Sequence, residues 1–191
     1  MIAALYVDGS GPYSNRDDVD VWDVERDARK YAGPMPVVAH PPCNTWSVLA
    51  HSNVWRGIPI GSDGGCFESA LAAVRKYGGV LEHPALTEAW PAFGLPVPIR
   101  GCWTQTFDDP GLTTEVSQVA YGHLSRKRTW LYTVGIGAVE MRWNEPDAPG
   151  RCGHDNVSRS GRFRLTRDQA IHTPPEFLET LINMAKKVGT E

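Results

Sequence analysis

The sequence of 191 residues carries a formal net charge of −3 and contains 41% hydrophobic residues, enough for one folded domain with a substantial core. It shows neither an apolar run long enough to cross a bilayer nor a basic-then-apolar leader, so we expect a soluble, cytoplasmic protein with no membrane partner. The four cysteines lie far apart without a C-x-x-C pair, which favours free thiols over a disulfide framework. The negative charge argues against a protein that merely coats nucleic acid. Acidic residues gather at 8–27 and basic ones at 121–167, however, which permits a basic face.

Short apolar runs separated by turns predict the elements of the N-terminal part. Residues 3–7 and 19–22 are expected as strands, and the turn D-G-S-G-P-Y at 8–13 follows the first of them. Residues 24–31 are expected as a short helix, which Gly33-Pro34 ends.

The stretch P-V-V-A-H-P-P-C, which begins at Pro36, is the centre of the predicted fold. Its apolar residues 36–39 are typical of a strand that is buried on both faces. Proline cannot continue a strand ladder, so the strand ends before Pro41-Pro42, and Cys43 lies in a stiff loop at its carboxyl end. Ligands bind at this edge of open α/β sheets, which makes Cys43 a candidate nucleophile.

A helix and a second buried strand follow this loop. Ser62 is expected to cap a helix whose apolar residues recur at helical spacing until Gly78-Gly79. Val80-Leu81 then predicts a strand that ends in E-H-P, and strand–helix–strand order predicts a right-handed parallel crossover. Because the carboxyl ends of neighbouring parallel strands lie side by side, we expect one pocket there, formed by Cys43 and Glu82 and flanked by His40 and His83.

The remaining elements complete a prediction of one α/β domain over residues 1–191, with a Rossmann-like, mostly parallel sheet and flanking helices. A helix interrupted at Pro91 is expected over 86–93, and strands at 115–121 and 129–134 are joined by G-H-L-S-R-K-R. Residues from about 135 to 165 read as a loop-rich basic segment. T-P-P-E at 173–176 predicts the start of a C-terminal helix over about 174–187.

With these motifs in place, the chain resembles the cytosine-C5 DNA methyltransferases, above all the small phage- and prophage-type relatives that lack a separate target-recognition domain. P-P-C at 41–43 matches the family's Pro-Cys, and E-H-P at 82–84 stands where the family has Glu-Asn-Val. The stretch from Gln118 to Arg128 stands where the family has Gln-x-Arg-x-Arg, with wider spacing. The resemblance implies a methyltransferase-like fold, DNA modification, and a bacterial cell or a phage-infected host cell as the location.

The family chemistry assigns roles to these residues. A thiolate adds to carbon 6 of a pyrimidine, a carboxylic acid near N3 stabilises the charge that develops in the ring, and an arginine supports the base. Thymidylate synthases also place a nucleophilic cysteine after Pro-Pro, so both DNA and a pyrimidine nucleotide stay open as substrates. The resemblance implies catalytic roles for Cys43, Glu82, Arg126 and Arg128, and substrate contacts for His40, Trp46, His83, Gln118 and Lys127.

The family's cofactor motif has only a partial counterpart. Its glycine-rich turn corresponds here to L-Y-V-D-G-S-G-P-Y, which implies that Asp8, Gly9, Gly11 and Asp23 bind S-adenosylmethionine. Asp23 follows the turn too soon for a full crossover helix, since a parallel connection needs about a dozen residues or more. We therefore expect an abbreviated N-terminal cofactor half.

Two other classes of function remain open at this level. One is a protein that keeps the methyltransferase-like fold and binds nucleic acid or a nucleotide without turnover. The other is a zinc-dependent hydrolase, indicated by the H-x-x-C spacing of His40 and Cys43 and the C-x-H spacing of Cys152 and His154. Zinc sites prefer paired short spacings at both ends, so we expect no metal here. The simplest alternatives are a buried structural Cys43, and a solvated turn at 126–128.

Overall fold

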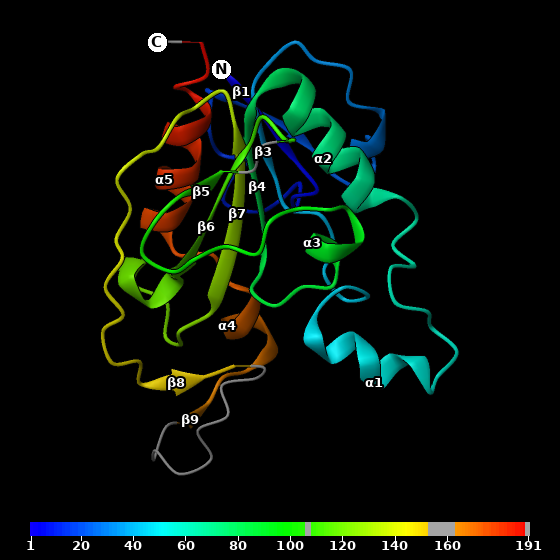
Figure 1. Cartoon of the computed structure of the whole chain (residues 1–191), viewed down its shortest axis with the longest axis vertical. Coiled ribbons are helices and arrows are strands. Elements are labelled where there is room, and N and C mark those ends of the chain that lie inside the picture. The colour runs from blue at the N-terminus through cyan, green and yellow to red at the C-terminus, as the bar shows by residue number, and fades with distance from the viewer. Residues whose placement is uncertain (106–107, 153–162, 190–191) are drawn as a thin grey trace.

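The computed structural model describes residues 1–105, 108–152 and 163–189, and these residues form a sheet with helices on both of its faces. Figure 1 shows the layers, with α5 on one side of the strands and α2 on the other. The central sheet has seven strands in the order β2-β1-β3-β4-β7-β6-β5. Their bounds are β1 (Ile2–Leu5), β2 (Val19–Trp22), β3 (Val37–Ala39), β4 (Gly79–Pro84), β5 (Thr104–Gln105), β6 (Leu112–Ser117) and β7 (Arg128–Val134).

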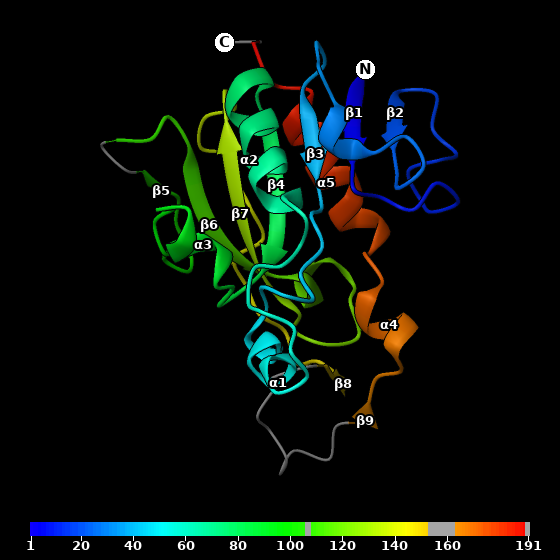
Figure 2. The ribbon, with the colours of Figure 1, turned by 90° about the vertical axis from the view of Figure 1, so that its right-hand side faces the viewer.

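The strands fall into a parallel group and an antiparallel group. β1 pairs in parallel with both β2 and β3, and β3 pairs in parallel with β4. β7 runs antiparallel to β4, and β6 and β5 continue the antiparallel pairing, as the opposed arrows of β4 and β7 show in Figure 2. The expected α/β class with a mostly parallel sheet is confirmed at this level.

Two amphipathic helices cover the faces of the sheet. α2 (Cys66–Tyr77) buries Phe67, Ala70, Leu71 and Val74 on one face, as its helical spacing predicts. α5 (Pro175–Ala185) covers the other face with Phe177, Leu178, Leu181 and Ile182. Side chains of one strand alternate between these two cores, so consecutive residues of β4 face different helices.

Some of the predicted elements are confirmed. Val19–Trp22 is a strand as expected, and the β3–α2–β4 crossover is present. The expected strand over 115–121 is wrong in its second half, because β6 ends at Ser117 and Gln118–Tyr121 form the 3-10 helix η3. Residues 24–31 form only the 3-10 turn η1 (Ala28–Lys30). The carboxylates of Asp23, before this segment, and Asp27, within it, accept hydrogen bonds from nearby backbone N–H groups and so compete with a longer helix.

Two helix starts also differ from the prediction. α2 begins after Gly65 rather than Ser62, because the carboxylate of Asp63 accepts hydrogen bonds from the N–H groups of Gly65 and Phe67. α5 is preceded by a helix that was not predicted, α4 (Arg167–Ile171), which begins at a capping box of Thr166 and Gln169.

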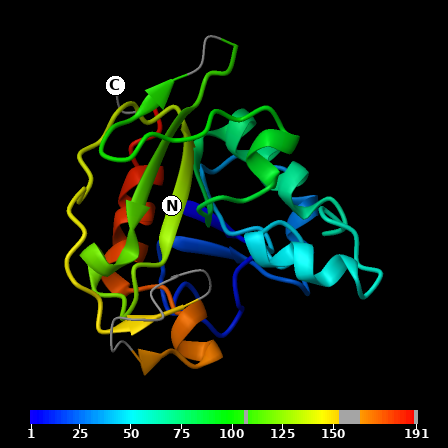
Figure 3. The ribbon, with the colours of Figure 1, turned by 60° about the horizontal axis from the view of Figure 1, so that its bottom comes forward.

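The remaining short elements gather near the carboxyl ends of the parallel strands or lie between the main ones. The η2–α1 segment and the group of α4, β8 and β9 lie at the same end of the molecule in Figure 2, and Figure 3 shows them as separate projections. No helix in the described part of the chain is long and apolar enough to cross a membrane. The bounds are η2 (Val48–Ala50), α1 (His51–Val54), α3 (Ala89–Ala92), η3 (Gln118–Tyr121), β8 (Gly150–Arg151) and β9 (Phe163–Arg164).

Candidate active site at the carboxyl ends of β3 and β4

The crossover brings Cys43 and Glu82 to one edge of the sheet. β3 and β4 pair in register with Ala39 opposite Leu81, so His40 and Glu82 follow side by side. The two prolines then lead the chain to Cys43, whose carbonyl accepts hydrogen bonds from the N–H groups of Trp46 and Ser47. The register therefore brings these two residues to the same edge of the sheet, where the charge of Glu82 acts to raise the pKa of the partly buried Cys43 thiol.

Glu82 is held by one hydrogen bond to each of its oxygens. Nδ1 of His40 lies 3.0 Å from Oε2, and Nε2 of Gln118 donates to Oε1 over 3.2 Å. The same Gln118 nitrogen also donates to Oγ1 of Thr129 over 2.9 Å. The Glu82 side chain is only 15% exposed. Two segments that are distant in sequence therefore hold one carboxylate.

The surroundings of Glu82 favour its ionised form. Burial acts to raise the pKa of Glu82, but the hydrogen bond from His40, together with the charge of Lys127, brings it below its ordinary value. Glu82 is thus an anion at neutral pH that can still accept hydrogen bonds from a ligand, because a carboxylate oxygen accepts more than one.

Cys43 is a thiol rather than a thiolate in the unliganded chain. Burial raises the pKa of Cys43, and the negative charge of Glu82 raises it further, while Lys127 acts in the opposite direction. Any nucleophilic role of this thiol therefore needs an acceptor for its proton or a ligand that compensates the charge of Glu82.

Lys127 is the cation of this site. It lies in the turn before β7 with a φ of 40°, which is rare for a residue with a side chain. Its Nζ donates to the carbonyl oxygens of Ile171 and His172 over 3.0 and 2.7 Å, and its charge acts on Cys43 and Glu82. Burial lowers the pKa of Lys127, and these two groups oppose the shift.

Arg126 and Arg128, for which catalytic roles are expected from the resemblance, both form ion pairs in the structure. Arg128 forms a two-pronged ion pair with Glu115 over 2.8 and 2.7 Å, and Glu115 is only 4% exposed. Nε of Arg126 pairs with Glu145 over 2.8 Å. These ion pairs fasten β6, β7 and the following loop to one another, so both arginines have a structural role. Lys127, between them, is the residue that interacts with Cys43.

His83 and Trp46 also lie elsewhere than expected. His83 follows Glu82 on β4, so its side chain faces the α2 core, where it stacks on Trp90 and bonds Oγ1 of Thr87 over 2.7 Å. Burial lowers the pKa of His83 to about 4. Trp46 is 7% exposed and donates to Asp63 over 2.8 Å. Both side chains belong to the core and do not line the Cys43 site.

One member of the site was not predicted. The hydroxyl of Tyr13 lies 2.7 Å from Nε2 of His40, and Tyr13 is only 4% exposed. Tyr13 stands at the end of the glycine turn, but no sequence pattern connects residue 13 with residue 40, so this contact could not be predicted.

Three of the four expected cofactor residues line one hollow. A cavity of about 540 Å³ is lined by the ends of β1 and β2, including Asp8, Gly9 and Asp23, whereas Gly11 is not among its lining residues. Gly11 closes the turn instead by donating to the carbonyl of Asp8 over 2.9 Å. A Cβ on Gly9 would lie 2.4 Å from Oδ2 of Asp23, so only glycine leaves this carboxylate its place. The hydrogen bonds of Ser10 hold the pKa of Asp8 below its usual value.

The strand order reverses between β1 and β3, because β1 leads to β2 on one side and β3 leads to β4 on the other, and ligands bind at such switch points. The hollow lies on the β2 side of β1, next to this point. The connection from β1 to β2 contains no helix, which confirms that the spacing before Asp23 is too short for one. The two strands are nevertheless parallel.

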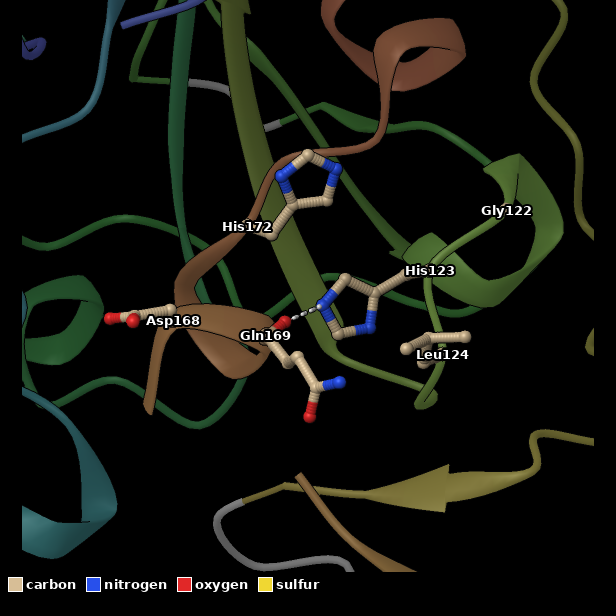
Figure 4. Close-up of a pocket in the computed structure, with 6 residues that line it drawn as sticks. All are labelled: Gly122, His123, Leu124, Asp168, Gln169 and His172. Atoms are coloured by element: carbon tan, nitrogen blue, oxygen red, sulfur yellow. Dashed lines mark hydrogen bonds between the residues drawn. The ribbon is translucent and has the colours of Figure 1, made fainter. Parts of the chain in front are cut away.

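A second hollow of about 360 Å³ lies between residues 122–124 and α4 (Figure 4). His123 and His172 lie on its walls, and Nε2 of His123 bonds the carbonyl of Gln169 over 3.1 Å. The carbonyl of His172 is one of the two that Lys127 holds, so this hollow borders the Cys43 site.

A metal site finds no support among the residues that the structure describes. They contain no group of three or more His, Cys, Asp or Glu side chains placed to hold a metal ion. His40 bonds Tyr13 and Glu82, and the sulfur of Cys152 accepts from Oγ of Ser125 at 2.9 Å. His154, the other predicted ligand, lies outside the described residues.

Searches against models of protein families, curated proteins and solved structures gave no match.

Proposed function

We propose that this chain modifies a pyrimidine base in the manner of a cytosine-C5 methyltransferase, with Cys43 as the nucleophile. The observation that carries the proposal is the meeting of a thiol, an ionised carboxylate and an ammonium group at the ends of β3 and β4. This set matches the chemistry of addition to carbon 6 of the ring.

The protonation states suggest how the addition proceeds. The Cys43 sulfur forms a bond to carbon 6, the C5=C6 double bond breaks, and its electron pair spreads over the ring towards N3. The thiol proton passes to Glu82, the nearby anion, and from there to N3. Glu82 is then an anion again, N3 carries the proton, and carbon 5 becomes a nucleophile.

The charges around the thiol favour this order of events. Glu82 raises the pKa of Cys43 as long as its own charge is uncompensated. A base that donates a hydrogen bond to Glu82 removes part of this effect, so the thiolate forms more readily once the substrate is bound. Lys127 supports the thiolate throughout.

The hollow beside β1 and β2 fits a nucleoside cofactor such as S-adenosylmethionine. Carboxylates after a first and a second parallel strand accept hydrogen bonds from ribose hydroxyls in nucleoside sites. Asp8 and Asp23 occupy such positions, and Gly9 leaves the backbone open. When bound there, the cofactor supplies the methyl group for carbon 5.

Covalent trapping tests the proposal. The protein is incubated with S-adenosylmethionine and either a DNA duplex containing 5-fluorocytosine or 5-fluoro-dCMP, and the adduct is detected by mass spectrometry. We expect an adduct in the wild type, its loss in Cys43→Ala, and its retention in Cys102→Ala, which changes an exposed cysteine. An absent wild-type adduct, or one that survives Cys43→Ala, refutes the proposal. The comparison of the two probes decides between DNA and a mononucleotide.

A second candidate is a binding protein without turnover. The raised pKa of Cys43 and the helix-free connection after the glycine turn favour it. Calorimetry separates the two, because saturable binding of S-adenosylmethionine that is lost in Asp23→Asn supports an enzyme. Binding of the fluorinated DNA without an adduct supports the alternative.

A further inference from the structure

A continuous hydrogen-bonded chain crosses the switch point of the sheet and ends on Glu82. It runs from the Tyr13 hydroxyl to Nε2 of His40 over 2.7 Å, and from Nδ1 of His40 to Oε2 of Glu82 over 3.0 Å. Tyr13 comes from the connection after β1, His40 directly follows β3, and Glu82 lies in β4, so the Tyr13 and Glu82 ends lie on either side of the imidazole. Tyr13 is 4% exposed, and the side chains of His40 and Glu82 are 16% and 15% exposed.

The environment of Tyr13 sets the direction of this chain. Burial raises the pKa of Tyr13 far above its ordinary value, so the phenol keeps its proton and acts as a donor. In the described part of the chain, His40 is the only hydrogen-bond partner of this hydroxyl. Nε2 of His40 therefore accepts, and the ring proton is on Nδ1, from where it is donated to Glu82.

We propose that Tyr13 and His40 are positioning residues, which fix Oε2 of Glu82 as an ionised acceptor by holding the imidazole in its Nδ1–H tautomer. The inference rests on the proposed role of Glu82 in base recognition. Gln118 anchors the other oxygen, so the carboxylate is held at both ends and cannot rotate. Its remaining lone pairs face the ligand in one orientation, which is the requirement for selective binding of a base edge.

The charges around this chain come from four directions. Glu82 is faced by Lys127 from the turn before β7 and by Cys43 from the loop after β3, while His83, the next residue of β4, lies on the opposite face of the sheet. Tyr13 is faced by Arg16 and by Glu179 of α5. None of these groups is hydrogen-bonded to Oε2 of Glu82 in the described part of the chain, so none of them replaces the bond from His40.

Titration of Glu82 in the free protein tests the inference without any substrate. The Glu82 carboxyl is followed by carbon-13 NMR and the His40 ring by nitrogen-15 NMR, in the wild type and in two substitutions of His40. We expect His40→Leu to raise the pKa of Glu82 by about one unit or more, since it removes a donor from a mostly buried carboxylate. His40→Asn places an amide N–H near the position of Nδ1, so it is expected to retain most of the wild-type value.

Tyr13→Phe tests the outer link. We expect it to weaken the tautomer preference of His40 in the nitrogen-15 spectrum, whereas Tyr121→Phe, which changes a second buried tyrosine, leaves that spectrum as in the wild type. The inference is overturned if the pKa of Glu82 is the same in His40→Leu and the wild type, or if wild-type His40 carries its proton on Nε2.

The trapping assay then connects the chain to chemistry. We expect Tyr13→Phe to slow adduct formation about tenfold with little change in the affinity for the fluorinated duplex, equivalent to about 1.4 kcal/mol in the barrier. His40→Asn is expected to form adduct faster than His40→Leu. A wild type that forms no adduct refutes the proposed function and leaves the titration result intact, so the two failures are distinguishable.

Discussion

The ion pair between Arg128 and Glu115 gives the sharpest test of the structural role that we assign to Arg128. Glu115 is 4% exposed and accepts four hydrogen bonds, from two nitrogens of Arg128, from Nε1 of Trp130 at 2.9 Å and from Nε of Arg100 at 3.2 Å. Glu115→Gln keeps the shape of the side chain but turns one acceptor into an NH2 donor that faces other donors.

The size of the effect follows from this geometry. Breaking a buried ion pair by removing one partner costs about 3–5 kcal/mol. The Arg128 side chain is 39% exposed, however, so water can solvate part of its charge, and we expect a loss of about 2–3 kcal/mol. Unfolding in urea at neutral pH, followed by tryptophan fluorescence, measures it. Glu140→Gln makes the same chemical change at an exposed position and is expected to stay within about 0.5 kcal/mol of the wild type.

The pH dependence of the unfolding free energy tests the same ion pair. Burial acts to raise the pKa of Glu115, but the hydrogen bonds of Arg128 and Trp130 bring it below the ordinary value. The contribution of the ionised carboxylate is therefore complete above the unfolded-state pKa of about 4.3 and is lost as the pH falls through the folded-state value. We expect the difference in unfolding free energy between the wild type and Glu115→Gln to become smaller at acidic pH. Equal urea midpoints for Glu115→Gln and Glu140→Gln at neutral pH would refute the reasoning.

Three further outcomes are expected. Gly79→Ala places a Cβ 2.0 Å from the carbonyl oxygen of Val37 at a φ of 124°, so it should lower the unfolding free energy by more than Gly57→Ala, where φ is 74° and no atom lies within 4 Å; equal losses would contradict this. His83 has its pKa lowered to about 4, so the unfolded state takes up a proton first as the pH falls below about 6.5. The unfolding free energy should then drop by about 2 kcal/mol between pH 7 and 5. His83→Gln should remove this drop when urea unfolding is measured at the two pH values, whereas an equal drop in the variant and the wild type would exclude His83 as its source. Gly9→Ala, whose Cβ would displace the Asp23 carboxylate, should weaken S-adenosylmethionine binding in calorimetry about tenfold or more, equivalent to about 1.4 kcal/mol, while Gly57→Ala should bind as the wild type; equal affinities would show that the hollow is not the cofactor site.

The sequence predicted those features that depend on short-range pattern. Apolar runs ending in proline placed β3 and β4, and the crossover rule then brought Cys43 and Glu82 together without any knowledge of the side-chain contacts. The expectation that His83 flanks the same pocket as Glu82 could have been avoided from the sequence. Consecutive residues of a strand face opposite sides of the sheet, so these two side chains cannot share a pocket.

The contacts between distant segments were beyond the sequence. The bond from Tyr13 to His40 spans 27 positions, and that from Gln118 to Glu82 spans 36. The choice of Lys127 over Arg126 and Arg128 depends on Glu115 and Glu145, which take up the arginines. Composition gives no information on which of three adjacent cations an acidic partner elsewhere will bind.

The helix-free link between β1 and β2 leaves the outer strand dependent on ions. Asp18, which precedes β2, pairs with Arg16 at 3.0 Å and with Lys186 of the C-terminal segment at 2.6 Å, and Arg16 also pairs with Glu179 of α5. Such partly exposed pairs weaken as salt screens them, whereas the apolar packing of β3 and β4 does not. Raising the ionic strength should therefore loosen β2 and the wall of the neighbouring hollow before the Cys43 site changes, so that salt affects the two halves of this sheet edge at different concentrations.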